Sequence, residues 1–344
     1  MLAEETHSPY SRRRVTLEDV AREAGVSAMT VSRVVRGMDK RVTQETAHHV
    51  RKVIAELGYQ PDMVAKSLRG DPTRTIGLML ASFGGYFFSN CARTIDELAQ
   101  NAGYSVLLAG THENSDAEAS QFNMLMSHRI DGLLVVLTPG RHEFLKHALA
   151  EGFPVVALER EVASMAVDSV VIENRLGARQ ATEHLLQHGH RRIACVYNES
   201  RIYSVSERIK GYEEAMKAAG LETNLLRGQD VEHVGHTLSK ALLSNDPPTA
   251  LFATNSVLAL QILPVLEKHN LKIPESMAVI GFDDFPAAPY LPSPMTTVRQ
   301  PITELGARAV ELLFRKIADR HTKSTTRIAL ATELIVRRSC GCAG

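Results

Sequence analysis

One stretch near the N-terminus decides the class of this chain. Residues 16–34 read T-L-E-D-V-A-R-E-A-G-V-S-A-M-T-V-S-R-V. The apolar side chains at its start recur at i, i+3, i+4 and i+7, which is typical of a helix with one buried stripe. Gly25 supplies a tight turn, and Ser27 can cap a second helix. The stretch therefore predicts a helix over 17–24, a turn, and a second helix over 28–36.

A third helix completes a small N-terminal domain. Thr43 can cap this helix, and Gly58 is suited to end it. We expect the helix over 44–57, with its buried face formed by Ala47, Val50, Ile54 and Leu57. Together, the three segments predict a three-helix domain over residues 15–60.

The second helix carries side chains suited to a DNA groove. In a helix-turn-helix, the early residues of the second helix reach the base edges, which here are Ala28, Met29 and Arg33. Arg33 can bind guanine through two hydrogen bonds, and the other two offer apolar contact. Residues that can hold phosphate without reading sequence are Ser27, Thr30, Ser32 and Arg36. The alternative is an ordinary three-helix bundle with a solvated arginine.

Charge supports the DNA interpretation locally. The 344 residues carry no net charge, but residues 11–70 hold twelve Lys or Arg against seven Asp or Glu. A basic head on a balanced body suits contact with phosphate. We expect residues 1–14 to form a disordered basic arm. The total length predicts two or three domains.

A short linker follows the head. Residues 59–70 read Y-Q-P-D-M-V-A-K-S-L-R-G, with a helix-compatible proline near the start and a glycine at the end. Such a segment is too short to be a stable helix alone, but two copies could fold together over DNA. Leu68 could then enter the minor groove beside Arg69 and kink a base step. The alternative is a plain flexible linker.

These motifs resemble the lactose/galactose repressor family, known as the LacI/GalR family. The resemblance rests on V-T-L-E-D-V-A-R-E-A-G-V-S-x-x-T-V-S-R-V-V at 15–35, L-G-Y-Q-P at 57–61 and A-K-S-L-R-G at 65–70. It implies a helix-turn-helix, a hinge helix over 61–72 that operator DNA orders, and an effector domain shaped like periplasmic sugar-binding proteins. It also implies dimers or tetramers on near-palindromic operators.

From Arg74 onwards, apolar strand candidates alternate with helix candidates. The expected strands are 76–81, 105–109, 132–137, 155–158, 169–172, 193–197, 250–253 and 277–281, which ends the series. The expected helices are 89–102, 117–128, 144–151, 175–188, 206–219 and 257–269. Continuous apolar strands between helices predict parallel sheets covered on both faces, and hence an α/β body of two doubly wound lobes.

The resemblance also implies where the chain passes between the lobes of the body, residues 73–344. The three crossings are expected near Glu159–Asp168, Phe285–Thr297 and Thr322–Thr326. Lobe one would then hold about 73–160 and 298–323, and lobe two about 161–296. A late helix over 302–317 would return to the first lobe.

Ligands of such sheets bind beyond the carboxyl ends of the strands, so the residues there are candidates for an effector site. After the first strand come Phe87 and Phe88, where the family commonly has Asn-Pro-Phe followed by an aromatic residue. Either ring could stack on the apolar face of a sugar. The alternative is that both rings only pack in the hydrophobic core at the start of a helix.

Three further candidates suit a ligand with several hydroxyls. Asp accepts from hydroxyls, Asn donates and accepts, and Arg offers a planar fork of donors. By position, the resemblance places the family's effector contacts on Arg208, Asn255 and Asp283. The alternatives are a solvated arginine in the first turn of a helix and an aspartate that only forms a turn.

The chain departs from the family pattern at three positions near this site. Ser256 replaces the aspartate of the family's Thr-Asn-Asp, and Ser82 stands where an aspartate is frequent. Glu159, followed by Arg160, stands where Asp-Arg is common, and we expect Glu159 to reach the ligand. Fewer carboxylates make an anionic ligand such as a sugar acid easier to accommodate.

No motif for catalysis or for a cofactor is present. The sequence has no G-x-S-x-G, no P-loop, no G-x-G-x-x-G after a strand, and no Cys–His or paired-carboxylate pattern. Cys340-Gly341-Cys342 could form a metal or redox element, but we interpret it as a loose tail. His188 and His190 are interpreted as a solvated helix end, so no metal site is expected.

The sequence thus predicts a cytoplasmic transcription regulator that forms a dimer, with a tetramer as the alternative. No apolar run reaches the ~18 residues of a membrane span. We expect a repressor that binds double-stranded operator DNA and a carbohydrate or sugar-acid effector, with no enzyme activity. The alternatives are a sugar-binding module without DNA function and a regulator that responds to a protein partner.

Overall fold

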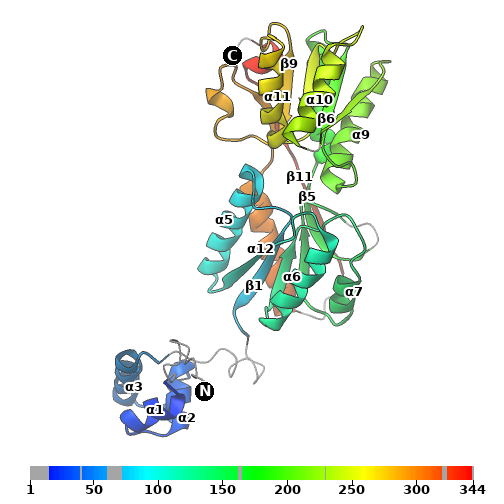
Figure 1. Cartoon of the computed structure of the whole chain (residues 1–344). Coiled ribbons are helices and arrows are strands. Elements are labelled where there is room, and N and C mark those ends of the chain that lie inside the picture. The colour runs from blue at the N-terminus through cyan, green and yellow to red at the C-terminus, as the bar shows by residue number, and fades with distance from the viewer. Residues whose placement is uncertain are drawn as a thin grey trace, which may run out of the picture. The chain divides into compact units, whose positions relative to one another are not determined.

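The chain divides into two compact units, Met1–Thr73 and Arg74–Gly344 (Figure 1). The computed structural model describes residues 15–38, 41–59, 72–161, 165–228, 230–319 and 324–342. The expected arm over 1–14 lies outside the described residues. So do residues 61–71 of the expected hinge, with Leu68 and Arg69.

The first unit is the three-helix head that the sequence predicts. Its helices are α1 (Leu17–Glu23), α2 (Ala28–Val35) and α3 (Gln44–Leu57). The side chain of Thr16 accepts a hydrogen bond from the Asp19 amide, and the Asp19 carboxylate accepts one from the Thr16 amide. This reciprocal pair fixes the start of α1. Ser27 and Thr43 cap α2 and α3 as expected, because their side chains accept from the amides of Thr30 and Thr46.

The core of the head is small and aliphatic. Val20, Val31 and Val50, one from each helix, have no exposed surface. On α3 the expected stripe is partly wrong, because Val53 is fully buried while Ile54 and Leu57 are only half-buried. Positions i+3 and i+4 share a helix face, so the packing of α1 and α2 decides which of the two lies deeper.

The first lobe of the second unit is built on a parallel six-stranded sheet. Its strands, in the order β11-β5-β4-β3-β1-β2, are β11 (Arg327–Leu330), β5 (Asp168–Ile172), β4 (Val155–Leu158), β3 (Gly132–Val135), β1 (Thr75–Leu80) and β2 (Ser105–Gly110). One face is covered by α5 (Tyr86–Asn101) and α12 (Ile302–Ala318), which pack together. The other face is covered by α6 (Ser115–Ser127) and α7 (Glu143–Ala150) (Figure 1).

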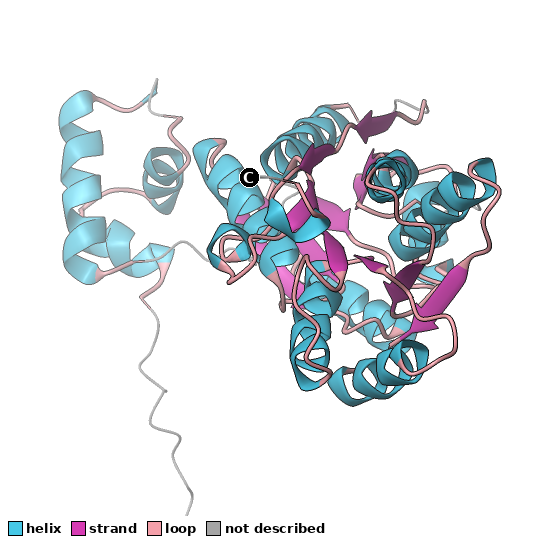
Figure 2. Ribbon diagram, turned by 90° about the horizontal axis from the view of Figure 1, so that it is seen from above, coloured by secondary structure: helices cyan, strands magenta, loops and turns pink. Residues whose placement is uncertain are grey.

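The second lobe repeats this plan with one antiparallel edge. Its sheet, in the order β12-β10-β9-β8-β6-β7, holds β12 (Glu333–Ile335), β10 (Thr296–Arg299), β9 (Ala278–Phe282), β8 (Ala250–Ala253), β6 (Ile193–Tyr197) and β7 (Asn224–Arg227). Only β12 runs antiparallel, against β10. The helices around it are α8 (Asn174–Gln187), α9 (Tyr203–Ala218), α10 (Val231–Leu242) and α11 (Ser256–Lys268), and Figure 2 shows helices on the outside of the strands.

The strands place the passages between lobes later than expected. Strand β5 pairs with β4 in the first sheet, so the first passage follows Ile172 instead of lying at 159–168. Strand β10 belongs to the second sheet, so the second passage follows Arg299. The third lies between β11 and β12, after Leu330. Each expected passage was therefore too early by one strand.

One strand that the sequence missed, β10, has a clear physical cause. Strand β10 contains two threonines that are fully buried because their hydroxyls are bonded, Thr297 to Asp284 and Thr296 to the Arg337 carbonyl. Such strands lack the apolar run that marks a buried strand in a sequence. The helix α10 and the strands β7, β11 and β12 were also missed.

Helices α8 and α9 approach each other closely. A Cβ on Gly211 of α9 would meet the carbonyl oxygen of Arg175 and the amide of Arg179 on α8. Only glycine allows this contact between the two backbones. Tyr212 is fully buried beside it, and its hydroxyl donates to the Ile193 carbonyl at 2.7 Å. The position of α9 is thus tied to α8 and to β6.

The end of the chain is packed against the second lobe. After the short 3-10 turn η2 (Ala288–Tyr290), a second turn, η3 (Arg338–Cys340), lies against β9 and β10. Cys340 has no exposed surface, so the expectation of a loose tail is wrong. Among the described residues, no helix is long and apolar enough to cross a membrane.

Candidate functional site

The predicted base-reading side chains lie along α2 of the head. Met29 is 64% exposed, and the Arg33 guanidinium donates to its sulfur at 3.3 Å, one helical turn away. The two side chains therefore share one face of α2. Ser27 caps the helix, and its hydroxyl lies 2.9 Å from that of Thr30. Ala28 and Ser32 are half-buried, and Arg36 is exposed at the C-terminal end.

The effector candidates meet at a cavity between the two lobes of the second unit. Its volume is about 270 Å³, close to the lower end of the range for small-molecule sites. The carboxyl ends of β1, β4, β6, β8, β9 and β10 all open onto it. All six residues expected from the sequence line it: Phe87, Phe88, Glu159, Arg208, Asn255 and Asp283.

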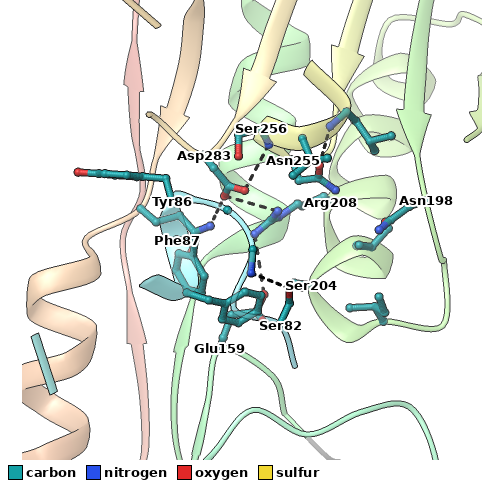
Figure 3. Close-up of a pocket in the computed structure, with 18 of the residues that line it drawn as sticks. Ser82, Tyr86, Phe87, Glu159, Asn198, Ser204, Arg208, Asn255, Ser256 and Asp283 are labelled. Atoms are coloured by element: carbon teal, nitrogen blue, oxygen red, sulfur yellow. Dashed lines mark hydrogen bonds and ion pairs between the residues drawn. The ribbon is translucent and has the colours of Figure 1, made fainter. Parts of the chain in front are cut away.

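Arg208 lies at the centre of this cavity (Figure 3). It comes from α9, is 4% exposed, and lies 3.7 Å above the ring of Phe282. Its Nε donates to Asn174 Oδ1 at 2.8 Å, and its Nη1 donates to the Thr254 carbonyl at 2.6 Å. Burial lowers the pKa of Arg208, while the nearby Asp283 and Glu159 carboxylates oppose that shift.

Asp283 faces Arg208 across a wider gap than in a close ion pair. The Asp283 Oδ1 to Arg208 Nη1 distance is 3.7 Å, and Asp283 also accepts from Gln300 Nε2 and from the Ser256 amide. Burial raises the pKa of Asp283 above its ordinary value, although Arg208 and these hydrogen bonds act against the shift. A ligand hydroxyl could bond to both charged groups at once.

The charged side chains that the first lobe contributes to the cavity are paired with one another. Arg160 is buried, and its guanidinium bonds to both oxygens of Glu113 at 2.6 and 2.7 Å. Its Nε donates to Glu159 at 2.9 Å. Burial acts to lower the pKa of Arg160, but the bonds to Glu113 and the charge of Glu159 raise it overall. Glu159 also lies 4.0 Å from Arg208, so it is close to a buried arginine of each lobe.

Three carboxylates of the cavity sit on a left-handed backbone. The φ angles are 57° at Glu113, 63° at Glu159 and 73° at Asp283. Residues other than glycine rarely adopt this conformation, and it concentrates at functional sites. At all three positions the strain places a carboxylate at the cavity.

The aromatic candidates line the cavity but also belong to the core. Phe87 is only 8% exposed, and its ring meets that of Phe88 edge-on at 5.1 Å. Tyr86 is 37% exposed at the same end of α5. Tyr86 also lines the cavity and is more exposed than Phe87, and the sequence did not single it out.

Unpaired amide oxygens add polar capacity to the cavity. The side-chain oxygens of Asn198, Gln261 and Gln300 line it, are buried, and have no hydrogen-bond partner within the described part of the chain. Buried polar atoms are nearly always paired, so these three mark places where a ligand or water bonds. The cavity thus combines a weakly paired Arg208 and Asp283 with several acceptors.

The sequence missed several lining residues. Asn198 and Glu113 follow β6 and β2, so the rule of looking beyond each strand would have found them. Gln300 follows β10, which carried no apolar run. Arg160 was noted only as the neighbour of Glu159, and its role as the partner of Glu113 joins residues 47 positions apart.

Comparisons with known proteins agree with this arrangement. Residues 16–62 match bacterial regulatory proteins of the lacI family, and residues 182–340 match a periplasmic binding protein-like domain. The HTH-type transcriptional repressor PurR of Vibrio vulnificus is 34% identical over 331 residues, covering 94% of this chain and 97% of the relative. The chain belongs to the LacI family of transcriptional regulators.

Other LacI family members extend the likeness over nearly the whole chain. The HTH-type transcriptional regulator DegA of Bacillus subtilis is 31% identical over 332 residues, covering 95% of this chain and 98% of the relative. The lac repressor dimer bound to operator and an anti-inducer matches with a TM-score of 0.84 at 25% identity, covering 95% and 99% of the two chains. The complex of the regulator CelR with cellobiose matches with a TM-score of 0.70 at 31% identity, covering 95% and 100%.

Family membership confirms the predicted fold and class. The chain is an α/β regulator with a helix-turn-helix head, mostly parallel sheets and a ligand-binding-type body, and it is not an enzyme. LacI-type regulators bind operator DNA and small-molecule effectors.

Proposed function

We propose that this LacI family member is a dimeric repressor. Its affinity for operator DNA is controlled by a small carbohydrate, a ligand with several hydroxyls, that binds in the cavity between the lobes. The observation that carries the proposal is the pairing pattern around Arg208. Its partners Asp283 and Glu159 lie at 3.7 and 4.0 Å, and three amide oxygens nearby have no partner among the residues that the structure describes. Hydroxyl groups, which both donate and accept, fit such a set.

Charge favours a neutral sugar over a sugar acid or a sugar phosphate. The cavity is lined by three carboxylates, Glu113, Glu159 and Asp283, against two guanidiniums. Arg160 is held by Glu113 and Glu159, which leaves Arg208 to face any anion. An anionic ligand would have to approach Asp283 and Glu159, and like charges at short range oppose binding. Ser82 and Ser256 stand where the family often has aspartates, so the cavity carries less negative charge than the family pattern. This weakens the preference for a neutral sugar but does not reverse it.

Relatives support the class of ligand. CelR is seen with cellobiose, and a LacI-type regulator from Alkaliphilus metalliredigens, 26% identical with a TM-score of 0.69, is seen with D-xylulofuranose. Several relatives are named as repressors, which supports repression as the proposed mode of regulation. A protein partner is less suitable, because Arg208 and Asp283 are too deeply buried to meet a second protein.

The control mechanism follows from the two lobes. A ligand that bonds to Arg208 and Glu159 together joins side chains from both lobes, and it therefore favours one relative position of the lobes. We propose that this shift changes the contacts between the first lobes of a dimer and the pairing of its two hinge segments over DNA. A coupling of about 1–3 kcal/mol would change operator affinity about 5- to 150-fold.

Base contacts by α2 form the other half of the proposal. Arg33 and Met29 share an exposed face of α2, with Ala28 beside them, and these residues are proposed to contact bases. Ser27, Thr30, Ser32 and Arg36 are proposed to hold phosphates, and Leu68 with Arg69 to enter the minor groove.

A thermal-shift screen tests the ligand class. The panel holds neutral mono- and disaccharides including cellobiose, sugar acids, sugar phosphates and purine bases. A ligand that binds the folded chain raises the unfolding temperature, by an amount that grows with the logarithm of its concentration divided by its Kd. The expected result is stabilisation by a neutral sugar. Stabilisation only by sugar acids or phosphates would move the proposal to an anionic ligand, and stabilisation only by a purine would overturn it.

A mobility-shift experiment on a pool of near-palindromic DNA tests the other part. The full chain is expected to select related sequences in which two half-sites face each other, because a symmetric dimer reads symmetric DNA. Binding without any sequence preference, or to single half-sites only, would contradict the dimeric repressor.

A further inference from the structure

Two histidines and two cysteines meet at the end of the second lobe, away from the cavity. His184 lies in the last turn of α8, and His188 caps the same helix four residues later, so both rings project from one face. Cys340 ends η3, and Cys342 follows it by two residues. The four ligand-type atoms lie within 4.8 Å of one another.

The distances between these atoms suit a single metal ion. His184 Nε2 lies 3.2 Å from Cys340 Sγ and 3.5 Å from Cys342 Sγ, and His188 Nε2 lies 3.0 Å from Cys342 Sγ. Zinc bonds of about 2.3 Å to sulfur and about 2.0 Å to nitrogen place tetrahedral ligands roughly 3.3–3.8 Å apart. Shifts of about 1 Å or less would therefore complete a tetrahedron around one ion.

The local backbone holds the two cysteines in this position. Gly341 has φ of 96°, which reverses the chain after η3 and returns Cys342 towards α8. Cys340 has no exposed surface, and the Thr296 hydroxyl lies 3.1 Å from its sulfur, where it can donate to a thiolate. Such an outer hydrogen bond orients a metal ligand. The C-terminal end of α8 also favours positive charge.

We propose that His184, His188, Cys340 and Cys342 form a structural site for one Zn²⁺ ion per chain, which fastens the end of the chain to α8. Two thiolates and two imidazoles in a closed tetrahedron are the donor set of structural zinc, and they leave no open position for catalysis. His190 does not belong to the group of atoms that lie within 4.8 Å of one another, and its Nδ1 lies 3.1 Å from the Thr249 hydroxyl. His188, which the sequence indicated as a solvated helix end, is a ligand in this proposal.

The proposed ion would stabilise the scaffold behind the effector cavity. Asn174, the first residue of α8, accepts the hydrogen bond from Arg208 Nε, and it lies ten residues or about 15 Å along the helix from His184. Metal binding at one end of α8 would thus fix the helix that positions the central arginine at the other end. This role adds a site to the proposed function and does not depend on the identity of the effector.

The test measures bound metal in the full chain without an affinity tag. The protein is incubated with Zn²⁺, dialysed, and analysed for metal by mass spectrometry. The variants Cys342→Ser and His188→Gln change the two more exposed ligands, which limits damage to the fold. The matched control is His190→Gln, which alters a histidine two residues away. Circular dichroism checks that every variant is folded.

The expected result is one zinc per wild-type chain and per His190→Gln chain. Zinc affinity should fall by more than about 10-fold in Cys342→Ser and His188→Gln, since even outer-shell changes cost that much. Chelation should lower the unfolding temperature of the wild type by several degrees and leave Cys342→Ser unchanged. Equal metal content in wild type and both ligand variants would overturn the proposal.

Cobalt substitution tests the geometry independently of the variants. Co²⁺ bound to the wild-type chain should show intense visible bands of a tetrahedral site and an ultraviolet thiolate charge-transfer band. The weak bands of an octahedral site without thiolate would contradict the proposal. So would a disulfide between Cys340 and Cys342 in protein that was purified with zinc and without oxidant.

Discussion

The head and the two-lobed body present their functional side chains in opposite ways. On α2, Met29 is 64% exposed and Arg33 lies along it, whereas in the cavity Arg208 is 4% and Asp283 is 9% exposed. An exposed face can meet a partner as large as DNA without rearrangement of the head. Buried groups can meet only a small ligand, and only when the lobes admit it.

The energetic consequences of this difference are also opposite. Exposed side chains can be removed at little cost to folding, so their loss should appear in binding alone. Arg208 and Asp283 are buried, incompletely paired charges, which cost stability unless a partner compensates them. In the proposed function, the body thus holds a site that a suitable ligand stabilises, and the head holds one that needs no rearrangement to meet DNA.

Arg208→Ala should produce the largest effect, confined to the body. The substitution removes charged donors in a buried site, each worth about 1.5–3 kcal/mol, so ligand affinity should fall roughly 10- to 150-fold or more. Operator affinity without ligand should stay close to that of the wild type. Titration calorimetry with the compound that the thermal-shift screen selects measures the loss.

The matched control for this variant is Lys210→Ala, which changes an exposed cation on the same helix. Arg208→Lys tests charge without the planar fork and should recover only part of the affinity. Unchanged ligand affinity in folded Arg208→Ala would show that Arg208 does not bind the ligand.

Arg33→Ala should affect the head alone. Loss of a bidentate contact to guanine costs about 1–3 kcal/mol at one operator base pair and relaxes preference there. Competition binding with single-base operator variants measures the preference, and ligand affinity should not change. Arg22→Ala, on α1 and paired with Asp19, is the control. Equal weakening on every DNA sequence would show that Arg33 holds phosphate only.

Thr16→Ala should have a smaller effect, again in the head. Loss of the cap that bonds to the Asp19 amide costs about 1 kcal/mol of local stability. Hydrogen exchange should quicken at amides of α1, α2 and α3, while amides of the body keep their rates. Faster exchange in both units would contradict their independence as folded bodies.

The smallest expected effect concerns how the free energy of unfolding of the body depends on pH. Because burial raises the pKa of Asp283 above 3.8, the folded chain holds this proton more tightly than the unfolded chain. The resulting stability is fully present below 3.8 and is lost as the pH rises through the raised pKa. Asp283→Asn lacks this titration, so its stability relative to wild type should increase as pH rises through that window. Urea unfolding at several pH values measures the difference, and a flat difference would contradict burial as the cause.

The head was predictable because its signals are local. Thr16, Ser27 and Thr43 cap helices within three residues of the amides that they accept from, and the apolar stripes lie within single helices. The cavity was predictable in part, since six lining residues follow strands or begin helices at positions that the family resemblance marks. Neither inference needed contacts between distant parts of the chain.

The remainder depends on contacts that spacing does not reveal. His184 and Cys340 are 156 residues apart and meet only because β12 and η3 pack against the second lobe. Arg160 and Glu113 meet across 47 residues. Strand β10 was missed because it is buried through bonded threonine hydroxyls instead of apolar side chains.

The most direct test of the account joins its two regions in one measurement. Operator affinity of the full chain is measured by fluorescence anisotropy, with and without the ligand chosen by thermal shift, for the wild type and for Arg208→Ala. The account predicts a change of about 5- to 150-fold in the wild type and none in the variant. The same operator affinity with and without saturating ligand in the wild type would contradict the coupling of body to head.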